Sequence, residues 1–224
     1  MKQLEIACFN LESAIIAEQG GANRIELCKE QHLGGTTPDI ETVREARDRL
    51  TIDLYVMIRP RGGDFCYNEK ELEQMKADII EMKSLGVTGF VFGILNQKDE
   101  VDKSINTELV RLAAPLPCTF HRAFDEIADL EKGIDDLVAC GFTTILTSGG
   151  YANVDEGERT LMELVAYAGK RIIIMPGGGL RSANSYRIAT RTNAAFYHSS
   201  AITDATGIAS LEEVKALRKN LSDF

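Results

Sequence analysis

Short apolar runs recur eight times along this chain of 224 residues, and a turn signal and a segment with helical spacing follow each one. Their starts lie roughly 20–35 residues apart, which is the span of one βα unit. Several runs are continuous stretches of β-branched or aromatic residues, as parallel strands buried on both faces require. We expect strands at residues 4–8, 24–28, 54–58, 89–95, 118–122, 144–147, 171–175 and 194–198.

The segments between these runs have the spacing of amphipathic helices. In residues 69–85 apolar side chains recur at steps of three and four, and Gly86 supplies a stop. Thr37 is the expected cap of another helix, with Pro38 at its first helical position. The clearest helices are expected at residues 37–50, 69–85, 129–141, 155–169 and about 210–221.

Eight strands that alternate with eight helices, without a linker-like segment, predict one (β/α)8 TIM barrel. We expect it to span residues 1–224 as a single compact domain, near the lower end of the usual range of about 200–400 residues. The alternative is an open doubly wound sheet. The absence of a GxGxxG motif after the first strand argues against it.

Composition excludes several classes of partner. The formal net charge is −9, which argues against nucleic acid. No apolar run approaches the roughly 20 residues of a membrane span, and the first residues lack a signal-peptide pattern, so we expect a cytoplasmic protein without a membrane partner. The five cysteines are odd in number and form no CxxC pair, so we expect reduced thiols and no structural zinc.

A run of three glycines follows the seventh expected strand. In a TIM barrel the loops after strands seven and eight commonly bind phosphate. Gly177, Gly178 and Gly179 would expose backbone N–H groups there, and Ser199 and Ser200 would add hydroxyl groups. The alternative is a tight turn that binds no ligand.

Three arginines lie at the ends of other strands. Arg59, Arg61 and Arg122 would place cations around the mouth of an otherwise acidic protein, and guanidinium groups suit carboxylate or phosphate. The alternative, which is compatible with the first, is that they pair with acidic residues of the barrel itself.

Candidate proton-transfer groups also lie in the expected strands. His121 is a candidate acid or base, with a satisfied structural histidine as the alternative, and His198 is a weaker candidate. Glu5 and Glu26 lie on adjacent expected strands. As paired carboxylates, one of them would have a raised pKa and serve as a base or a metal ligand.

Two cysteines end the first two expected strands. Thiolates of Cys8 and Cys28 on neighbouring strands would suit a soft ion such as Cu(I). Side chains alternate along a strand, however, and Cys8 lies three residues after Glu5 whereas Cys28 lies two after Glu26. If both glutamates point into the barrel, the cysteines point opposite ways unless a strand bends. The alternative is that both are small buried hydrophobes.

Nine sequence motifs occur in order between residues 4 and 201: LEIACFN, GGANRIELC, GGTTP, VMIRPRGGDFCY, VFGIL, PLPCTFHRAFD, GFTTILTSGG, IIIMPGGG and HSSA. In these motifs the chain resembles the CutC family of copper homeostasis proteins. That resemblance implies a cytoplasmic TIM barrel, often a homodimer, which binds Cu(I) through cysteine. Cys8 and Cys28 match the family's usual candidate ligands, and Cys66 matches a cysteine that part of the family carries.

Two departures from the family pattern affect the function that we expect. Some members have two consecutive cysteines where this chain has Ala7 and Cys8, and the segment after HSSA is short here. The long motifs are rich in Arg, His, Asp and Gly, which is typical of an enzyme site for a small anion. The alternative to copper binding is therefore an enzyme acting on a phosphorylated or carboxylated metabolite. Arg59, Arg61 and the 177–179 loop would hold the anion, and His121 with a glutamate would move protons.

Overall fold

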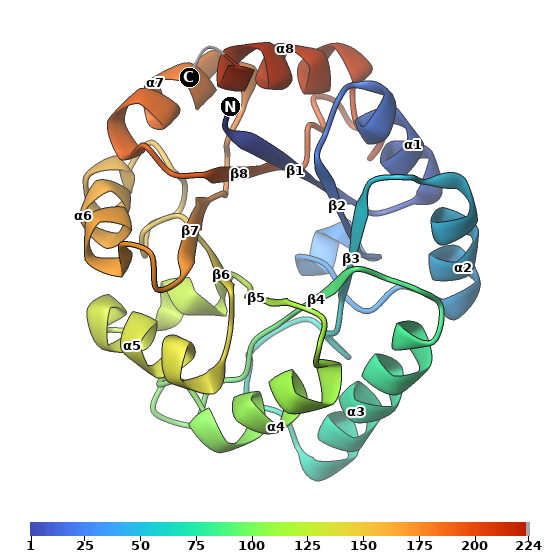
Figure 1. Cartoon of the computed structure of the whole chain (residues 1–224), viewed down its shortest axis with the longest axis vertical. Helices are drawn as coiled ribbons and strands as arrows, with labels where there is room; N and C mark the ends of the chain where they lie inside the picture. The colour runs from blue at the N-terminus through green and yellow to red at the C-terminus, as the bar shows by residue number, and fades with distance from the viewer. Residues whose placement is uncertain (223–224) are drawn as a thin grey trace.

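Eight parallel strands form a ring inside an outer ring of helices (Figure 1). The computed structural model describes residues 1–222. Hydrogen-bonded neighbours follow the order β7-β6-β5-β4-β3-β2-β1-β8, and β7 and β8 lie side by side where the ring closes. The predicted (β/α)8 barrel is therefore confirmed, and the open doubly wound sheet is excluded.

Strand and helix alternate through the described residues in the order that the sequence predicts. The strands are β1 (Gln3–Cys8), β2 (Arg24–Leu27), β3 (Asp53–Met57), β4 (Gly89–Phe92), β5 (Cys118–Phe120), β6 (Thr144–Thr147), β7 (Ile173–Pro176) and β8 (Phe196–Ser199). The helices are α1 (Leu11–Gln19), α2 (Ile40–Arg49), α3 (Glu69–Lys83), α4 (Lys103–Ala113), α5 (Leu130–Cys140), α6 (Glu158–Ala168), α7 (Ser182–Thr192) and α8 (Leu211–Ser222). Two short 3₁₀ helices, η1 (Gln31–Leu33) and η2 (Arg122–Glu126), follow β2 and β5.

The predicted start of α2 was wrong. Thr37 does not cap this helix, because its hydroxyl accepts the backbone N–H of Arg59 at 2.8 Å. Asp39 occupies the cap position instead, in an extended conformation. Pro38 therefore lies before the helix, and Thr37 ties the β2 loop to the end of β3.

Two observed strands end two or more residues before their apolar runs do. The run at 89–95 is a strand only to Phe92, and the run at 118–122 only to Phe120. His121 is the N-cap of η2, and its ring nitrogen accepts the backbone N–H two residues later. After β5 the chain therefore leaves the sheet just where its polar residues begin.

Alternation along the strands divides side chains between two environments. On β1, Leu4, Ile6 and Cys8 are fully buried in the large core between the sheet and the helices. Glu5 is also fully buried, and Ala7 lines a cavity inside the barrel. Because both faces of every strand are covered, the strands need no polar face, which explains their continuous apolar runs.

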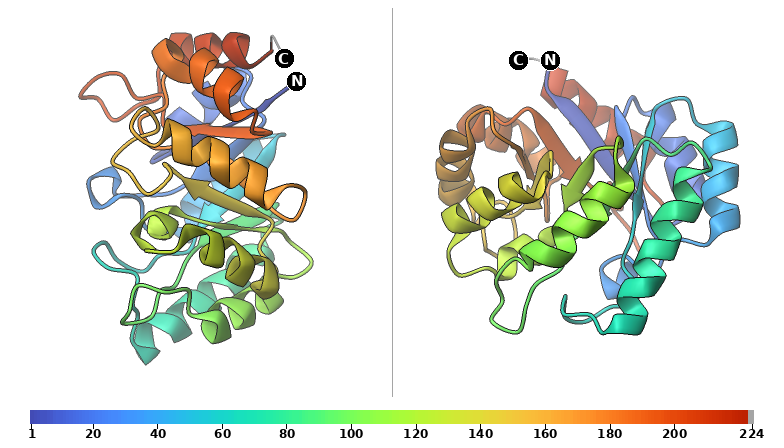
Figure 2. Two further views of the ribbon diagram at one scale, coloured as in Figure 1. Left: turned by 90° about the vertical axis from the view of Figure 1, so that its left-hand side faces the viewer. Right: turned by 60° about the horizontal axis from the view of Figure 1, so that its bottom comes forward.

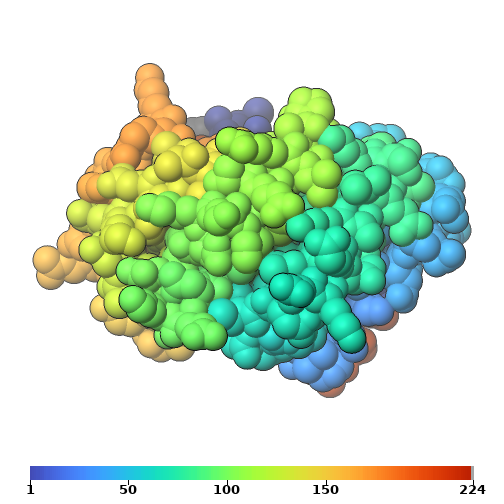
Figure 3. Space-filling model, turned by 90° about the horizontal axis from the view of Figure 1, so that it is seen from below, coloured from blue at the N-terminus to red at the C-terminus, as the bar shows by residue number. Residues whose placement is uncertain are grey.

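The two ends of the barrel differ. Both termini lie at one end, and the longer loops that follow the strands extend from the other (left view of Figure 2). The outer layer covers the strands from the side, as Figure 3 shows for α3 and α4 in teal and green. Among the described residues, no helix combines the length and the apolar character that a membrane crossing requires.

Candidate functional site

A cavity of about 210 Å³ lies inside the barrel where the strands end. Residues on or just after β1, β2, β3, β5, β6, β7 and β8 line it. This is the end at which TIM barrels place their active sites. The cavity is polar on two sides, one formed by β1, β2 and β8 and the other by the loop after β7.

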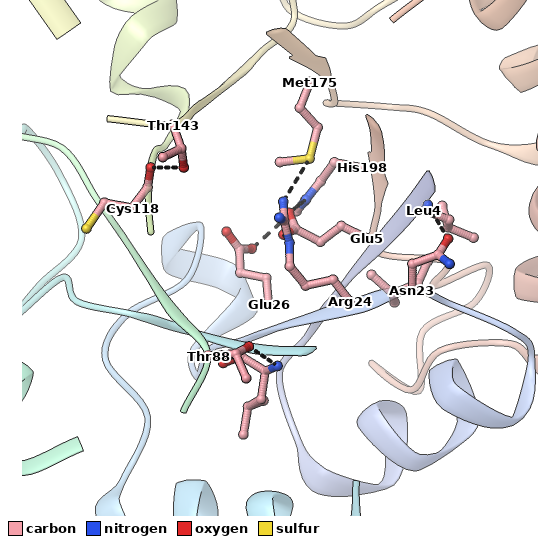
Figure 4. Close-up of polar contacts among 12 residues, drawn as sticks. Leu4, Glu5, Asn23, Arg24, Glu26, Thr88, Cys118, Thr143, Met175 and His198 are labelled. Atoms are coloured by element: carbon pink, nitrogen blue, oxygen red, sulfur yellow. Dashed lines mark hydrogen bonds and ion pairs between the residues drawn. The ribbon is translucent and has the colours of Figure 1, made fainter. Parts of the chain in front are cut away.

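Four ionisable side chains from β1, β2 and β8 form a buried network (Figure 4). Arg24 Nε donates to Glu5 Oε2 at 2.5 Å, and His198 Nδ1 lies 2.7 Å from Glu5 Oε1. His198 Nε2 lies 3.9 Å from Glu26 Oε2. The guanidinium of Arg24 is stacked between the rings of Tyr55 and Phe196, 4.1 and 4.2 Å from their centroids. Glu5 and Glu26 are therefore brought together, with His198 between them.

The network divides charge unequally between its carboxylates. Burial and the nearby Glu5 raise the pKa of Glu26 to about 7, against the attraction of His198. Burial also acts to raise the pKa of Glu5, but Arg24 and His198 outweigh it and hold this pKa below its usual value. Burial lowers the pKa of His198, yet Glu26 and Glu5 reverse this and raise it. Near neutral pH Glu26 is therefore partly protonated, while Glu5 stays ionised.

The same network is the one group of three His, Cys, Asp or Glu side chains in residues 1–222 whose spacing would allow a metal ion. Donor atoms of Glu5, Glu26 and His198 all lie within 4.8 Å of one another. Both oxygens of Glu5 are already engaged, however, and the Arg24 guanidinium 2.5 Å away opposes a second cation. Glu26 Oε1 is buried without a hydrogen-bond partner, so it is free to take a proton. The arrangement suits proton transfer better than metal binding.

His121 enters the cavity from β5 in a different electrostatic state. Burial, and then the neighbouring Arg59, lower its pKa to about 3. Its Nδ1 accepts the N–H of Ala123 at 3.3 Å, so the neutral ring carries its proton on Nε2. Nε2 is buried and has no partner. His121 is therefore a neutral N–H donor at pH 7 rather than a reservoir of protons.

The three glycines of the loop after β7 differ in whether they face the cavity. Gly178 and Gly179 line the cavity at φ of +97° and +75°, and neither N–H donates a hydrogen bond among the described residues. Gly177 does not line it. Its N–H bonds to the Thr147 carbonyl, and a Cβ there would lie 2.9 Å from His198 Cβ. Two of the three predicted glycines are thus placed to meet a ligand, and Gly177 packs against the site.

Ser199 and Ser200 lie beside this loop with a cation that the sequence reading missed. Arg181, the residue before α7, donates to Ser199 Oγ at 3.2 Å and Ser200 Oγ at 3.3 Å. All three line the cavity. Together with the free N–H groups of the glycine loop they form a positive concave surface at a helix N-terminus, which suits an anion.

The three predicted arginines differ in their placement. Arg59 and Arg122 line the cavity, and Arg61 does not. Arg61 pairs with Glu71 at 2.6 Å and Asp64 at 3.0 Å at the rim. Arg59 donates mainly to loop carbonyls, but its Nε is buried and unpartnered.

Arg122 joins two loops beside the cavity. It donates to Asp125 at 2.7 Å and Ser148 at 2.8 Å, which ties the β5 loop to the β6 loop. Internal pairing, the alternative to anion binding, therefore describes Arg61 fully and the other two arginines in part.

The cysteine thiols lie in separate environments. Cys8 packs in the core between sheet and helices, whereas Cys28 packs with Tyr55 and Met57 in a second cluster inside the barrel. The Cys28 thiol lies 3.6 Å from Glu26 Oε2. Burial raises the pKa of both thiols well above the usual value. In this geometry the two sulfurs face opposite sides of the barrel wall and do not form one two-cysteine site.

Cys66 lies apart from both of these thiols. It lies in the loop after β3, and its half-buried thiol donates to the carbonyl of Leu95, which follows β4, at 3.3 Å.

The sequence pattern did not single out two residues of the site, Arg24 in the buried network and Arg181 in the cavity wall. Arg24 begins β2, at the far end of the strand from the loops, but it shares the inward face with Glu26 by simple alternation. Arg181 follows the three glycines by only two residues, and its position before a helix was a usable signal.

Solved structures show which proteins share this fold. Phosphoribosylanthranilate isomerase from Thermotoga maritima superposes with a TM-score of 0.68 at 15% identity, covering 100% of each chain. This likeness concerns the fold alone. The copper homeostasis protein CutC from Streptococcus agalactiae superposes with a TM-score of 0.86 at 38% identity, covering 91% of this chain and 100% of that one.

Sequence comparison agrees with the second likeness. The copper homeostasis protein cutC homolog of Mus musculus is 43% identical over 198 residues, which is 88% of this chain and 73% of that protein. The sequence pattern of the CutC family matches residues 2–203. The resemblance seen in the motifs is thereby confirmed, and the chain belongs to the CutC family.

Proposed function

We propose that this barrel is an acid–base enzyme that acts on a small phosphorylated or carboxylated metabolite. One observation carries the proposal: a single cavity has a buried carboxyl group with one unpartnered oxygen, Glu26 Oε1, on one side and a positive loop, Gly178 to Arg181, on another. Fold alone does not decide function, so the argument depends on these side chains.

The anion would bind at the loops after β7 and β8. The free N–H groups of Gly178 and Gly179 and the hydroxyl of Ser200 would supply hydrogen bonds. The Ser199 hydroxyl already donates to the Leu180 carbonyl at 2.7 Å and instead helps to hold Arg181. Arg181 supplies charge next to the start of α7. A phosphate or carboxylate needs this combination of donors and positive potential.

The proton would move at the opposite group of residues. Glu26 has a pKa of about 7, so at neutral pH it is both present as a carboxylate and basic enough to accept a proton. His198 bonds to Glu5 through Nδ1, and its Nε2 lies 3.9 Å from Glu26 Oε2, so the charges of His198 and Glu26 depend on each other. Perturbed groups of this kind in a cavity are typical of catalytic sites.

The cavity limits the size of the substrate. Its volume of about 210 Å³ corresponds to about seven water molecules at about 30 Å³ each. Pockets for drug-sized ligands start at about 300 Å³. The substrate is therefore a small metabolite, not a polymer or a nucleotide cofactor.

Thermal denaturation with inorganic phosphate and glycerol phosphate tests the proposal. A ligand at 100 times its Kd stabilises the native state by about 2.7 kcal/mol. We expect both compounds to raise the melting temperature, and Arg181→Ala to abolish the shift. Arg61→Ala is the matched control, because Arg61 lies outside the cavity and should leave the shift intact. If neither compound stabilises the wild-type protein at millimolar concentration, the proposal fails.

Cu(I) binding is a second candidate, which the names of the relatives and the inward Cys28 favour. A soft thiolate is a suitable ligand for Cu(I). Because Cys8 and Cys28 lie in separate clusters, we expect Cys28→Ser to abolish stoichiometric Cu(I) binding and Cys8→Ser to preserve it. Cys118→Ser, at a buried cysteine on β5, is the control. Cu(I) binding that survives Cys28→Ser would exclude this candidate.

The homodimer and the cytoplasmic location expected from the resemblance stay predictions. Light scattering of the purified protein tests the first, and cell fractionation tests the second.

A further inference from the structure

His121 lines the cavity with a fixed ring, and the proposed function gives it no role. Its ring is held on three sides: Phe65 lies 4.8 Å away between centroids, Phe120 lies 5.9 Å away, and Gly93 lies against the imidazole. A Cβ on Gly93 would lie 2.8 Å from the ring atoms Nδ1 and Cε1. The orientation of the ring is therefore fixed by packing.

The hydrogen bonding of this ring leaves one donor for a ligand. Nδ1 accepts the Ala123 N–H, so the proton of the neutral ring lies on Nε2. Nε2 is buried, has no partner and belongs to a side chain that lines the cavity. A buried N–H without an acceptor is costly, so a site that keeps one has a use for it.

The charge of the ring limits what this donor can do. Burial and Arg59 together lower the pKa of His121 to about 3, so the imidazole stays neutral through the physiological range. A neutral N–H does not release a proton readily at pH 7. It can donate a hydrogen bond to an oxygen on which negative charge develops.

We propose that His121 Nε2–H binds the carbonyl oxygen of the substrate while Glu26 removes a proton from the carbon beside that carbonyl. This inference rests on the proposed function and narrows its substrate class to small phosphorylated α-hydroxy aldehydes or ketones. Strands β3 and β4 separate β2 from β5 on the ring, so the two groups approach the substrate from different sides.

The chemical step balances without any co-reactant. Glu26 Oε1 takes the proton from carbon, and the electron pair of that C–H bond forms a C=C bond. The π electrons of the carbonyl move to its oxygen, and the resulting enediolate oxygen accepts the hydrogen bond from Nε2. Glu26 then returns this proton to the neighbouring carbon, which carried the carbonyl. The hydroxyl proton passes directly between the two adjacent enediolate oxygens, so that the carbonyl forms at the other carbon and the product is the aldose–ketose isomer. Electrostatic stabilisation of such an oxygen by one donor contributes about 10²–10³ in rate.

Two variants separate the donor from the structural role of the ring. His121→Asn keeps an oxygen that can accept the Ala123 N–H and so preserves the start of η2, but it removes the donor at the position of Nε2. His121→Gln places an amide N–H near the position of Nε2. We expect Asn to lose the function of Nε2 and Gln to restore part of it.

Binding of a two-carbon phosphorylated hydroxamate, which mimics the enediolate, tests the inference against glycerol phosphate, which lacks a carbonyl. We expect the wild-type protein to bind the hydroxamate at least about 100-fold more tightly. His121→Asn should lose most of this advantage and keep its affinity for glycerol phosphate, and His121→Gln should regain part of it. NMR in D₂O also measures the rate at which phosphorylated aldoses and ketoses exchange this C–H proton for deuterium. This rate should fall in His121→Asn together with the affinity for the hydroxamate.

The outcomes distinguish the two proposals. If glycerol phosphate binds but the hydroxamate binds no more tightly, or if His121→Asn keeps the full advantage of the hydroxamate, this inference is overturned and the anion site stands. If neither compound binds the wild-type protein, the proposed function itself fails.

Discussion

Two buried histidines line one cavity, and the protein holds them in opposite states. His198 on β8 lies among carboxylates, which raise its pKa against the effect of burial. His121 after β5 lies among aromatic rings and beside Arg59, and its pKa falls to about 3. One side of the cavity therefore exchanges protons near neutral pH, and the other offers a donor whose charge does not change.

The difference shows that the neighbours of a histidine, and not its burial, decide its charge. Both side chains are almost fully buried, at 8% and 4% exposure. Glu5 and Glu26 more than offset the desolvation of His198, whereas no carboxylate offsets that of His121. The neighbouring strand sets this difference: β8 pairs with β1, which places Glu5 opposite His198.

Removing Glu5 should have the largest effect, because it takes from the buried Arg24 the carboxylate to which it is directly bonded. We expect Glu5→Gln to destabilise the protein by about 3–5 kcal/mol in urea unfolding at pH 7. Glu45→Gln is the control, since its pair with Arg49 is half exposed and should change stability by at most about 0.5 kcal/mol. A similar loss in both variants would mean that the β1–β8 side is not the electrostatic centre described above.

Each histidine abuts a glycine, which allows the two sides to be disturbed separately. We expect Gly93→Ala to displace His121 and Gly177→Ala to displace His198, each at a cost of about 1–3 kcal/mol from overpacking. Histidine side-chain NMR signals report which ring moved. If Gly93→Ala shifts the His198 signals as much as those of His121, the two sides are not independent.

The two sides should give the stability of the protein opposite dependences on pH. Below pH 6.5 the unfolded state protonates His121 and the folded state does not, so this residue makes stability fall as the pH drops toward 3. Glu26 holds its proton more tightly when folded, so it makes stability fall as the pH rises from 4.5 through about 7. Each group contributes a slope of at most about 1.4 kcal/mol per pH unit.

Urea unfolding between pH 5 and pH 7.5 measures these slopes. We expect His121→Asn to make the profile fall less steeply toward acid, and Glu26→Gln to make it fall less steeply toward neutral pH. Identical profiles for wild type and both variants would contradict the assigned charge states.

The most direct measurement is an NMR titration of the histidines in the wild-type protein, which involves no substitution and the smallest expected effect. In ¹⁵N NMR, His121 should remain a neutral Nε2–H tautomer down to pH 5, whereas His198 should titrate above the ordinary histidine pKa of about 6.5. Titration of His121 near pH 6.5 would remove the basis for its assignment as a neutral donor.

Periodicity alone predicted the barrel, because every strand is buried on both faces and therefore reads as a continuous apolar run. The same alternation correctly warned that Cys8 and Cys28 face opposite ways if both glutamates face inward. It also implies that Arg24 points inward, two residues before Glu26, but Arg24 begins its strand and so lies away from the strand ends where TIM barrels place their sites. The state of His121 could not be predicted, because it depends on Gly93 and Arg59, which only the closed barrel brings to it.

The position of Arg24 in the sequence determines when its buried ion pair can be covered during synthesis. This residue and Glu5 emerge early, yet the partners that cover them, Met175, Phe196 and His198, are separated from them by more than 150 residues of sequence. Until β7 and β8 have left the ribosome, the guanidinium and the carboxylate lack these three partners. The nascent barrel therefore acquires its charged centre last, and a chain interrupted before β8 exposes an ion pair where the finished protein has its site.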